Sequence, residues 1–242
     1  DETIAEFLNS VDAEFDTCST EQELCEQIAD LIDQENVIGW FQGRMEFGPR
    51  ALGARSIIGD ARSKEMQSVM NLKIKFRESF RPFAPIVLKE HVHEYFDLKD
   101  GQESPYMLVV ADVLAAHRNE LPEAYEKSFG IEKLNYVRSS VPAVTHVDYS
   151  ARIQTVGADR NPLLHQMMTR FYEKTGCPVM INTSFNVRSE PIVCTPEDAY
   201  RCFQMTGMDV LVIGRHVVRK TQQSGQMDED QRNEHLKQFQ LD

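Results

Sequence analysis

The sequence predicts an α/β fold, a twisted mixed sheet with flanking helices. Short apolar runs that are typical of buried strands alternate along the chain with helical patterns, and such alternation is characteristic of α/β proteins. Further apolar runs lie close together and predict hairpins, which give the sheet antiparallel as well as parallel pairs. The 242 residues can form one large or two small domains, and neither an internal repeat nor an evident linker divides them.

The first predicted elements surround a glycine-rich loop. A capping box at 20–23 begins a helix whose apolar residues follow at helical spacing. The next predicted elements, in chain order, are a strand at 37–41, the loop at 43–53, a helix at 63–71, and strands at 83–88 and 106–113.

The second half begins with a polar excursion at 115–141, whose prolines and glycine predict an insertion or a lid. The predicted elements after it are strands at 144–147 and 152–156, a helix at 162–175 that ends at Gly176, a strand at 178–182, a helix that begins at Thr195, and a strand at 210–213. Residues 220–242 are polar and predict a frayed tail or an exposed helix.

The formal net charge of -12 argues against broad nonspecific nucleic-acid binding, whose affinity comes largely from Lys and Arg on phosphates. Cations nevertheless cluster in one segment, namely Arg44, Arg50, Arg55, Arg62, Lys73, Lys75, Arg77 and Arg81. In an acidic protein, one basic segment is better matched to a small anion than to a polymer.

The composition indicates a protein of the reducing cytoplasm. The 5 cysteines lack CxxC spacing and predict neither a disulfide framework nor a zinc site. His91 and His93 have no evident acidic or Cys partner, so no metal site is predicted. No apolar run approaches the ~20 residues that a membrane helix needs. The acidic N-terminus has neither an initiator Met nor a signal peptide, which predicts a piece of a longer protein.

Three cations, Lys75, Arg77 and Arg81, lie within one short aromatic-rich segment. Arg offers a planar fork to phosphate oxygens and Lys a point charge. On a strand the three would share one face, and an intervening turn would change this. The segment predicts an anion site; the alternative is a solvated face in which Glu78 is the ion-pair partner.

Polar side chains gather directly after the apolar run at 178–181, where Asn182, Thr183, Ser184 and Asn186 follow. The ends of strands are where α/β proteins bind ligands, so these residues predict a binding site. The alternative is ordinary turn chemistry, in which Asn and Ser are common. Together with the cations, this segment predicts a pocket for a phosphorylated or adenylated small molecule.

Arg152 stands in an apolar strand and therefore needs a partner. An anionic ligand is one candidate, and Asp148 or Asp159 is the alternative. The loop at 43–50 matches neither a Walker loop nor GxGxxG, and its backbone amides suit either an anion or a domain contact. No nucleophile elbow or catalytic triad is evident.

Five segments follow one another in the chain: 39–53 (GWFQGRMEFGPRALG), 75–85 (KFRESFRPFAP), 151–156 (ARIQTV), 182–187 (NTSFNV) and 207–209 (GMD). In this order they resemble the O-carbamoyltransferases of nodulation-factor and antibiotic biosynthesis. The matches extend over residues 37 to 214, and long motifs in a fixed order are far more specific than any one of them alone.

The resemblance implies how the chain is organised. Family members are similar in having an N-terminal actin-like domain, which binds a metal and transfers the carbamoyl group to a hydroxyl. Their C-terminal YrdC-like domain makes carbamoyladenylate from carbamoyl phosphate and ATP, which is taken with Mg²⁺. This chain resembles the C-terminal part alone, so no tightly bound metal is expected and the transferase domain would be its partner. The implied divisions are a helical segment at 1–36, the YrdC-like domain at 37–219 and a tail at 220–242.

YrdC-like sites use a Lys-x-Arg element and a Ser-x-Asn element around the adenylate, and positions 75–77 and 184–186 match both. The resemblance implies that Lys75, Arg81 and Arg152 act catalytically by holding phosphate and carbamoyl oxygens. The ligand-binding residues that it implies are Arg77, Asn182, Thr183, Ser184 and Asn186.

Two positions depart from the family pattern and can alter loop geometry. Ala54 stands where Asn is expected, and Ser189 stands where Gly is expected. Two other functions are also compatible with the sequence. One is a noncatalytic nucleotide-binding or docking domain. The other is YrdC-type synthesis of threonylcarbamoyladenylate on tRNA, against which the net charge and the motif at 43–53 weigh.

Overall fold

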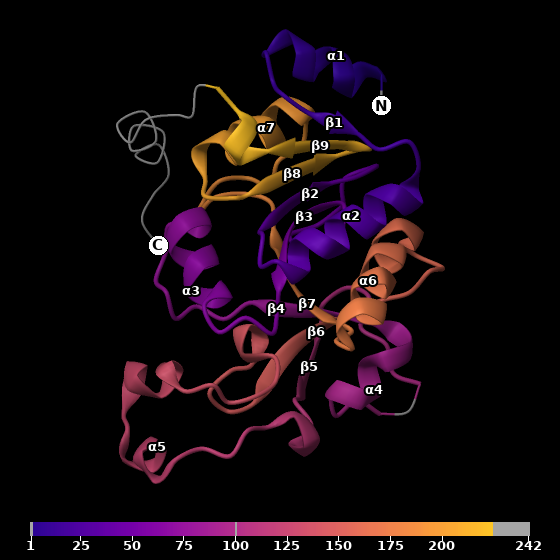
Figure 1. Ribbon diagram of the computed structural model, residues 1–242. Helices are drawn as coiled ribbons and strands as arrows, with labels where there is room; N and C mark the ends of the chain where they lie inside the picture. Colours follow the sequence, from indigo (N-terminus) through magenta and orange to yellow (C-terminus); the bar gives the residue numbers. More distant parts are fainter. Residues whose placement is uncertain (1, 100, 225–242) are drawn as a thin grey trace.

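One mixed sheet lies at the centre of the structure, a computed structural model that describes residues 2–99 and 101–224. Its strands are β1 (Asp16–Thr17), β2 (Ile38–Phe41), β3 (Arg55–Asp60), β4 (Ala84–Leu88), β5 (Val109–Asp112), β6 (Ser150–Val156), β7 (Val179–Ser184), β8 (Val210–Ile213) and β9 (His216–Arg219). They follow the order β1-β9-β8-β2-β3-β7-β4-β6-β5 (Figure 1). The pairs β2–β8 and β4–β6 are parallel, and the other neighbours are antiparallel. The predicted mixed α/β fold is therefore confirmed.

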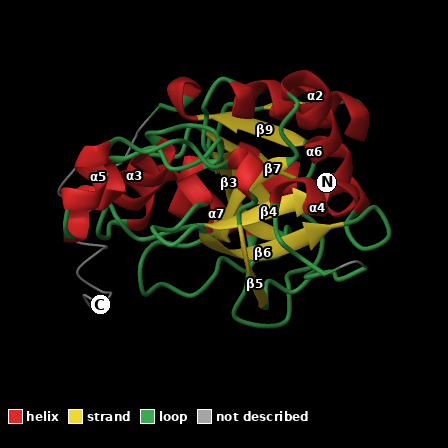
Figure 2. Cartoon of the chain, turned by 90° about the horizontal axis from the view of Figure 1, so that it is seen from below, coloured by secondary structure: helices red, strands yellow, loops and turns green. Residues whose placement is uncertain are grey.

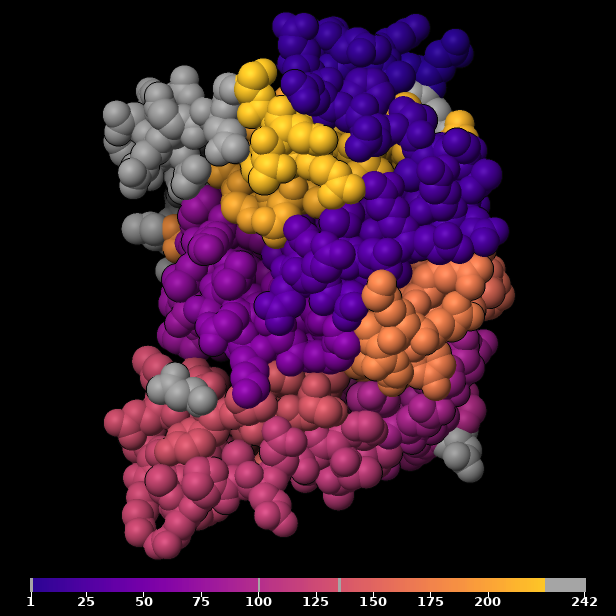
Figure 3. Space-filling view, viewed as in Figure 1, coloured from indigo at the N-terminus to yellow at the C-terminus, as the bar shows by residue number. Residues whose placement is uncertain are grey.

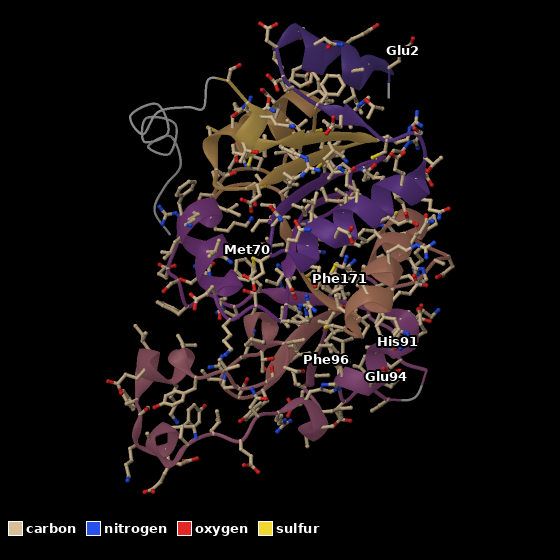
Figure 4. All side chains as sticks on the ribbon, in the orientation of Figure 1. Glu2, Met70, His91, Glu94, Phe96 and Phe171 are labelled. Atoms are coloured by element: carbon tan, nitrogen blue, oxygen red, sulfur yellow. The ribbon has the colours of Figure 1, made fainter. Side chains whose placement is uncertain are left out.

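Helices pack around this sheet. The α-helices are α1 (Glu2–Ser10), α2 (Glu21–Asp33), α3 (Met66–Met70), α4 (Val92–Tyr95), α5 (Glu123–Lys127), α6 (Pro162–Thr175) and α7 (Pro196–Met205). Helices α2 and α6 lie side by side (Figures 1 and 2), and α7 packs against β8 and β2. Phe171 of α6, labelled in Figure 4, is fully buried in the core that these helices share with the sheet.

The capping residues recognised in the sequence predict where the longer helices begin or end in the structure. Thr20 Oγ1 accepts the backbone N–H of Glu23 at 3.1 Å at the start of α2. Thr195 and Asp198 form a reciprocal capping box at the start of α7. Gly176 ends α6 with φ 71°, a left-handed conformation that glycine adopts without strain. These boundaries confirm the helices predicted from the sequence.

Strand β3 is a central element that the sequence pattern did not predict. It lies between β2 and β7, and all its residues are buried. Its apolar part consists of Ile57 and Ile58 alone, and its ends are the charged residues Arg55 and Asp60. Asp60 pairs with Arg62 at 2.6 Å, and the terminal guanidinium nitrogens of Arg55 donate to backbone carbonyls, although its buried Nε has no partner in the described part of the chain. Long-range pairing therefore overrides a weak local pattern.

The strand predicted at 144–147 is wrong. The segment begins at the end of a 3₁₀ turn, Pro142–Val144. The buried guanidinium of Arg138 donates to the carbonyls of Thr145 at 2.9 Å and His146 at 3.2 Å. One side chain thus satisfies carbonyl groups that a neighbouring strand would otherwise bind.

The helix predicted at 63–71 begins later and continues in a different form. Helix α3 leads into a π-helix, Asn71–Lys75, and Phe76 ends it with φ 48° in the left-handed region. The chain reverses there before it enters β4. Residues 75–81 therefore do not form a strand, and their cations do not share one strand face.

The excursion at 115–141 forms short elements outside the sheet: α5 and the 3₁₀ turns Ala115–His117 and Gly130–Asn135. It lies at the end of the molecule opposite α1 (Figures 1 and 3). Further 3₁₀ turns occur at Lys89–His91 and Lys220–Gln222. The rest of the predicted tail, residues 225–242, lies outside the described residues. Within the described ranges, no helix is long and apolar enough to cross a membrane.

Gly53 lies where the loop at 43–53 meets α6. It has φ +110°, and a Cβ there would come within 2.4 Å of Leu164 Cδ2 and 2.7 Å of Asn161 Nδ2. Gly53→Ala should therefore lower the free energy of unfolding by about 2–4 kcal/mol, through backbone strain and steric overlap. Urea denaturation measures this loss.

Gly43→Ala is the matched control for that substitution. Gly43 has φ +51°, and no atom lies within 4 Å of a Cβ built there. Only the left-handed penalty of about 1–2 kcal/mol is expected. Equal losses in the two variants would contradict the tight contact between the loop and α6.

Candidate functional site

Lys75 joins the end of the π-helix to the end of β7. Its side chain is buried, with 3% exposure, next to the left-handed Phe76. Its Nζ donates to the carbonyl of Ser184 at 2.5 Å and to the carbonyl and Oδ1 of Asn186, both at 2.8 Å. The Lys-x-Arg and Ser-x-Asn elements, far apart in the sequence, therefore meet in the structure.

Burial changes the ionisation of Lys75. Loss of hydration, together with the charge of Arg77, lowers the pKa of Lys75 to about 7. The hydrogen bonds of Nζ all go to protein oxygens at Ser184 and Asn186. Lys75 therefore orders the turn that follows β7, and its direct contact with a phosphate stays a prediction.

The turn after β7 is held by hydrogen bonds of its own. Ser184 Oγ donates to Asn186 Oδ1 at 2.7 Å, and Asn186 Nδ2 donates to the Glu190 carbonyl at 2.6 Å. Glu190 Oε2 accepts the Val187 N–H at 3.0 Å. Ser189 has φ 59°, a backbone conformation that favours glycine, so its departure from the family pattern places strain in this turn.

A cavity of about 170 Å³ lies at the C-terminal end of β7. Its lining residues are Pro49, Arg50, Ala51, Arg77, Pro82, Phe83, Ala84, Met107, Arg152, Asn182, Thr183 and Ser184. Most of the predicted site residues are thereby brought together, namely Arg77, Arg152, Asn182, Thr183 and Ser184. Arg50 was named in the basic segment but was not chosen as a site residue; the signal for that role was its place in a glycine-rich loop suited to an anion.

Arg152 lines this cavity from β6, and its side chain has no partner among the described residues. The guanidinium group makes no hydrogen bond or ion pair with any residue that the structure describes, and its buried Nε is unsatisfied. The two aspartates considered as partners of Arg152 have other contacts. Asp148 Oδ1 accepts from Ser150 Oγ at 2.7 Å, and Asp159 Oδ2 lies 3.7 Å from Arg160 Nε. Desolvation lowers the pKa of Arg152, which marks a cation held under unfavourable conditions.

Three arginines line the same cavity. Arg77 donates from Nε to Asn71 Oδ1 at 2.6 Å, and its guanidinium carbon lies 5.0 Å from the centre of the Phe83 ring. Arg50 comes from an exposed loop, and its charge contributes to the lowered pKa of Arg152. No carboxylate is found among the lining residues, all of which are described. An anion in the cavity would therefore relieve the repulsion between its cations.

Glu46 orders the loop at 43–53. Its Oε1 accepts the backbone N–H groups of Leu52 and Ala54, both at 2.7 Å. These bonds need only the main chain at position 54, so Ala54 leaves them intact. The ordered loop brings Arg50 to the cavity, and the lone acid among its glycines was the sequence signal for this role.

A larger hollow lies on the other side of this loop. It has a volume of about 700 Å³, and its lining includes Gln42, Tyr106, Gln154 and Asn161. This volume falls within the range of about 300–1,000 Å³ that drug-sized ligands occupy, whereas the volume of the arginine-lined cavity falls below it.

Arg81 and Asn186 are not among the residues that line the arginine-lined cavity. Arg81 Nε is 3.9 Å from Glu78, the alternative partner considered from the sequence, and the Arg81 side chain is 41% exposed. Two other cations of the basic segment serve the fold, because Arg55 donates to backbone carbonyls and Arg62 pairs with two aspartates. The basic segment is therefore not one continuous binding surface.

His91 has a carboxylate partner close by. Its Nδ1 lies 2.8 Å from Glu94 Oε1, and both residues are labelled beside α4 in Figure 4. Across the described ranges, no group of three or more His, Cys, Asp or Glu side chains is placed to hold a metal ion.

Comparison with known proteins identifies the family. A family model described as the carbamoyltransferase C-terminus matches residues 29–220. The chain belongs to this carbamoyltransferase C-terminal family, and the resemblance found in its motifs is confirmed.

Curated relatives match most of this chain. A protein of Synechocystis is 58% identical over 233 residues, which are 96% of this chain and 37% of that protein. The nodulation protein NolO of Bradyrhizobium diazoefficiens is 41% identical over 199 residues, or 82% of this chain and 33% of NolO. The 3'-hydroxymethylcephem-O-carbamoyltransferase of Streptomyces clavuligerus is 35% identical over 178 residues, which are 74% of this chain and 29% of that enzyme. The chain thus spans roughly a third of the length of these relatives.

Two solved structures share the fold at low sequence identity. Full-length HypF, in a phosphate- and nucleotide-bound form, superposes with a TM-score of 0.52 at 15% identity, covering 85% of this chain and 23% of HypF. A variant of P. abyssi Sua5 superposes with a TM-score of 0.50 at 10% identity, covering 81% of this chain and 50% of Sua5. At such identities the likeness concerns the fold alone, and it agrees with the YrdC-like architecture expected from the sequence.

Lys75→Met should destabilise the protein as well as disturb the site. The substitution leaves buried acceptor oxygens of Ser184 and Asn186 without their donor, which should cost about 1–3 kcal/mol in the free energy of unfolding. Lys73→Met is the matched control, since Lys73 is exposed on the same π-helix, and a change below about 0.5 kcal/mol is expected. Urea denaturation measures both; equal effects would mean that the Nζ contacts do not support the turn.

The same variant tests the ionisation of Lys75. The pKa is about 7 in the folded protein and 10.5 for an ordinary lysine, so the folded state binds fewer protons between these values. The contribution of this group to stability therefore rises with pH above 7 and is lost as the pH falls through 7. Relative to Lys75→Met, the free energy of unfolding of the wild type should rise by roughly 1 kcal/mol per pH unit. A difference that is independent of pH would show that the ammonium stays charged.

Proposed function

We propose that this chain forms carbamoyladenylate from carbamoyl phosphate and ATP, as the C-terminal part of a cytoplasmic O-carbamoyltransferase. The observation that best supports this is Arg152, a half-buried cation without a partner among the described residues, beside Arg50 and Arg77. Membership of the carbamoyltransferase family supports a carbamoyl substrate. Planar guanidinium groups suit the oxygens of its phosphate.

The two cavities suit two substrates of different size. The cavity of about 170 Å³ suits the small carbamoyl phosphate, whereas ATP with its Mg²⁺ needs more space. The hollow of about 700 Å³ offers that space. Ala51 lines the first cavity and Leu52 the second, so a reaction between the two ligands would take place beside this part of the loop.

The atoms of the proposed reaction balance when water takes part. Water converts carbamoyl phosphate to carbamate and phosphate, and a carbamate oxygen then attacks the α-phosphorus of ATP with release of pyrophosphate. Charge moves between phosphate oxygens in both steps, and positioned cations stabilise it. We assign Arg152 and Arg77 to these oxygens. We assign Lys75 to positioning Ser184, which lines the smaller cavity, and the neighbouring Asn186 for the carbamoyl end of the carbamoyladenylate.

Transfer to the final acceptor would belong to a part outside this chain. The relatives are roughly three times as long as the segment they share with it. Transfer needs a second site that holds a hydroxyl against the activated carbonyl and removes its proton. We propose that an N-terminal transferase domain supplies that site, so that this chain alone would not carbamoylate sugar or antibiotic hydroxyls efficiently.

Pyrophosphate release tests the proposed activity. The chain should release pyrophosphate only when carbamoyl phosphate and Mg²⁺·ATP are both present. Arg152→Ala should weaken carbamoyl phosphate binding about ten- to a hundredfold, because one charge-assisted contact contributes about 1.5–3 kcal/mol. Arg170→Ala is the matched control, since Arg170 is a cation of α6 paired with Glu173 and outside both cavities.

The outcomes separate this proposal from its alternatives. Binding of both substrates without pyrophosphate release would indicate a noncatalytic nucleotide-binding or docking domain. Activity that depends on bicarbonate and threonine would indicate synthesis of threonylcarbamoyladenylate for tRNA. Equal affinities in the Arg152 and Arg170 variants would contradict the arginine-lined cavity as the substrate site.

A further inference from the structure

A row of three side chains crosses the sheet along the arginine-lined cavity. Asn182 of β7 pairs with Ala84 of β4. Further along β4, Ile86 pairs with Gln154 of β6. Ala84 lies two residues before Ile86 on β4, and Arg152 lies two residues before Gln154 on β6. Because these strands are parallel, Ala84 and Arg152 are at the same level of the sheet. Asn182, Ala84 and Arg152 all line the cavity.

Ala84 makes room between the two polar ends of this row. Residues at the same level of neighbouring strands project to the same face of a sheet. The middle position carries only a methyl group, so the row presents a cation, Arg152, at one end and an amide, Asn182, at the other. A small ligand seated over Ala84 would have a charged group on one side and an amide group on the other.

The orientation of the Asn182 amide follows from a chain of hydrogen bonds. Gln154 Nε2 donates to the Leu52 carbonyl at 2.9 Å, which turns its Oε1 toward Asn182. Asn182 Nδ2 then donates to Gln154 Oε1 at 2.7 Å and to the Ala51 carbonyl at 2.9 Å. Both side-chain N–H groups of Asn182 are therefore engaged in hydrogen bonds. If the amide were flipped, its oxygen would lie against two acceptor oxygens and neither bond could form.

The remaining atom of this amide, Asn182 Oδ1, has no hydrogen-bond partner within the described part of the chain. The residue is 1% exposed, so bulk solvent does not cover this oxygen. Buried polar groups are nearly always paired, and an orphan in the wall of a cavity calls for an explanation. A ligand that pairs with Asn182 Oδ1 must supply a hydrogen-bond donor. A ligand that binds the arginines of the same cavity must supply an anionic group.

We propose that Asn182 recognises the amide of the carbamoyl group. Its Oδ1 accepts an N–H of the ligand –NH₂ while Arg152 binds an anionic oxygen. This inference rests on the proposed function and deepens it, because it names the feature of carbamoyl phosphate that the cavity distinguishes. An acyl phosphate with –CH₃ in place of –NH₂ has no N–H to donate and leaves Oδ1 unpaired. A site built around a buried hydrogen-bonding group rejects an analogue that lacks the matching group.

Two phosphonates that differ only at this group test the proposal. Phosphonoacetamide carries –NH₂ on its carbonyl carbon, and acetonylphosphonate carries –CH₃ there. Isothermal titration calorimetry with the 242-residue chain should show phosphonoacetamide binding at least about tenfold more tightly. In Asn182→Ala the two affinities should come within about twofold of each other, because the loss falls on the amide ligand.

Gln204→Ala is the matched control. Gln204 is another buried amide with an unpaired oxygen, and it lies on α7 outside the cavity lining. This variant should keep the preference for the amide. If Asn182→Ala does not fold, Gln154→Leu takes its place: it removes the acceptor that orients the Asn182 amide but retains Asn182, and the preference should fall.

Each outcome bears on a different part of the account. Equal affinity of the wild type for the two phosphonates would overturn the role of Asn182 and leave the anion site and the proposed function standing. A preference that persists in the Asn182 variant, or in the Gln154 variant that replaces it, would also overturn that role. Binding of neither phosphonate would overturn the carbamoyl phosphate site, and the proposed function with it.

Discussion

The hydrogen bonds from the Lys75 ammonium to the end of β7 are the contact on which the site depends. They join positions 109 residues apart in the sequence and fix the chain reversal after the π-helix against the turn that contains Ser184 and Asn186. A buried ammonium requires such acceptors, because an unpaired charge inside a protein is very costly. Arg77 follows two residues later and lines the cavity at the end of the same strand. Lys75 thereby helps to position Arg77 at the cavity.

The contacts of each arginine side chain distinguish the cations that stabilise the fold from those suited to bind a ligand. The number of cations in the basic segment does not make this distinction. Arg62 lies between two aspartates, and Arg55 is surrounded by backbone carbonyls, so both stabilise the fold. Arg152 has neither kind of partner within the described ranges, although it is half-buried. Its charge is retained at an energetic cost that an anion would offset. The unpaired oxygen of Asn182 in the same row across the sheet adds a requirement for a donor, and a carbamoyl phosphate has both groups.

Short-range signals in the sequence predicted the parts of the structure that short-range forces decide. The cap at Thr195 and the helix that ends at Gly176 are examples, as are the polar residues collected at the end of β7. Prediction failed where specific side-chain contacts and strand pairing decide the structure. Strand β3 carries buried charged residues at its ends, which bond to groups in the adjoining loops. Arg138 satisfies the carbonyls of Thr145 and His146 in place of a strand. The direction of Lys75 depends on a π-helix and a left-handed residue, which no hydrophobic period encodes.

A crystal structure of this chain with phosphonoacetamide bound tests the central claim, that the arginine-lined cavity receives carbamoyl phosphate, most directly. We expect phosphonate oxygens within about 2.7–3.2 Å of the guanidinium groups of Arg152 and Arg77, with Lys75 still bonded to Ser184 and Asn186. A phosphonate seated in the larger hollow, or held by surface cations while Arg152 remains without a partner, would contradict it.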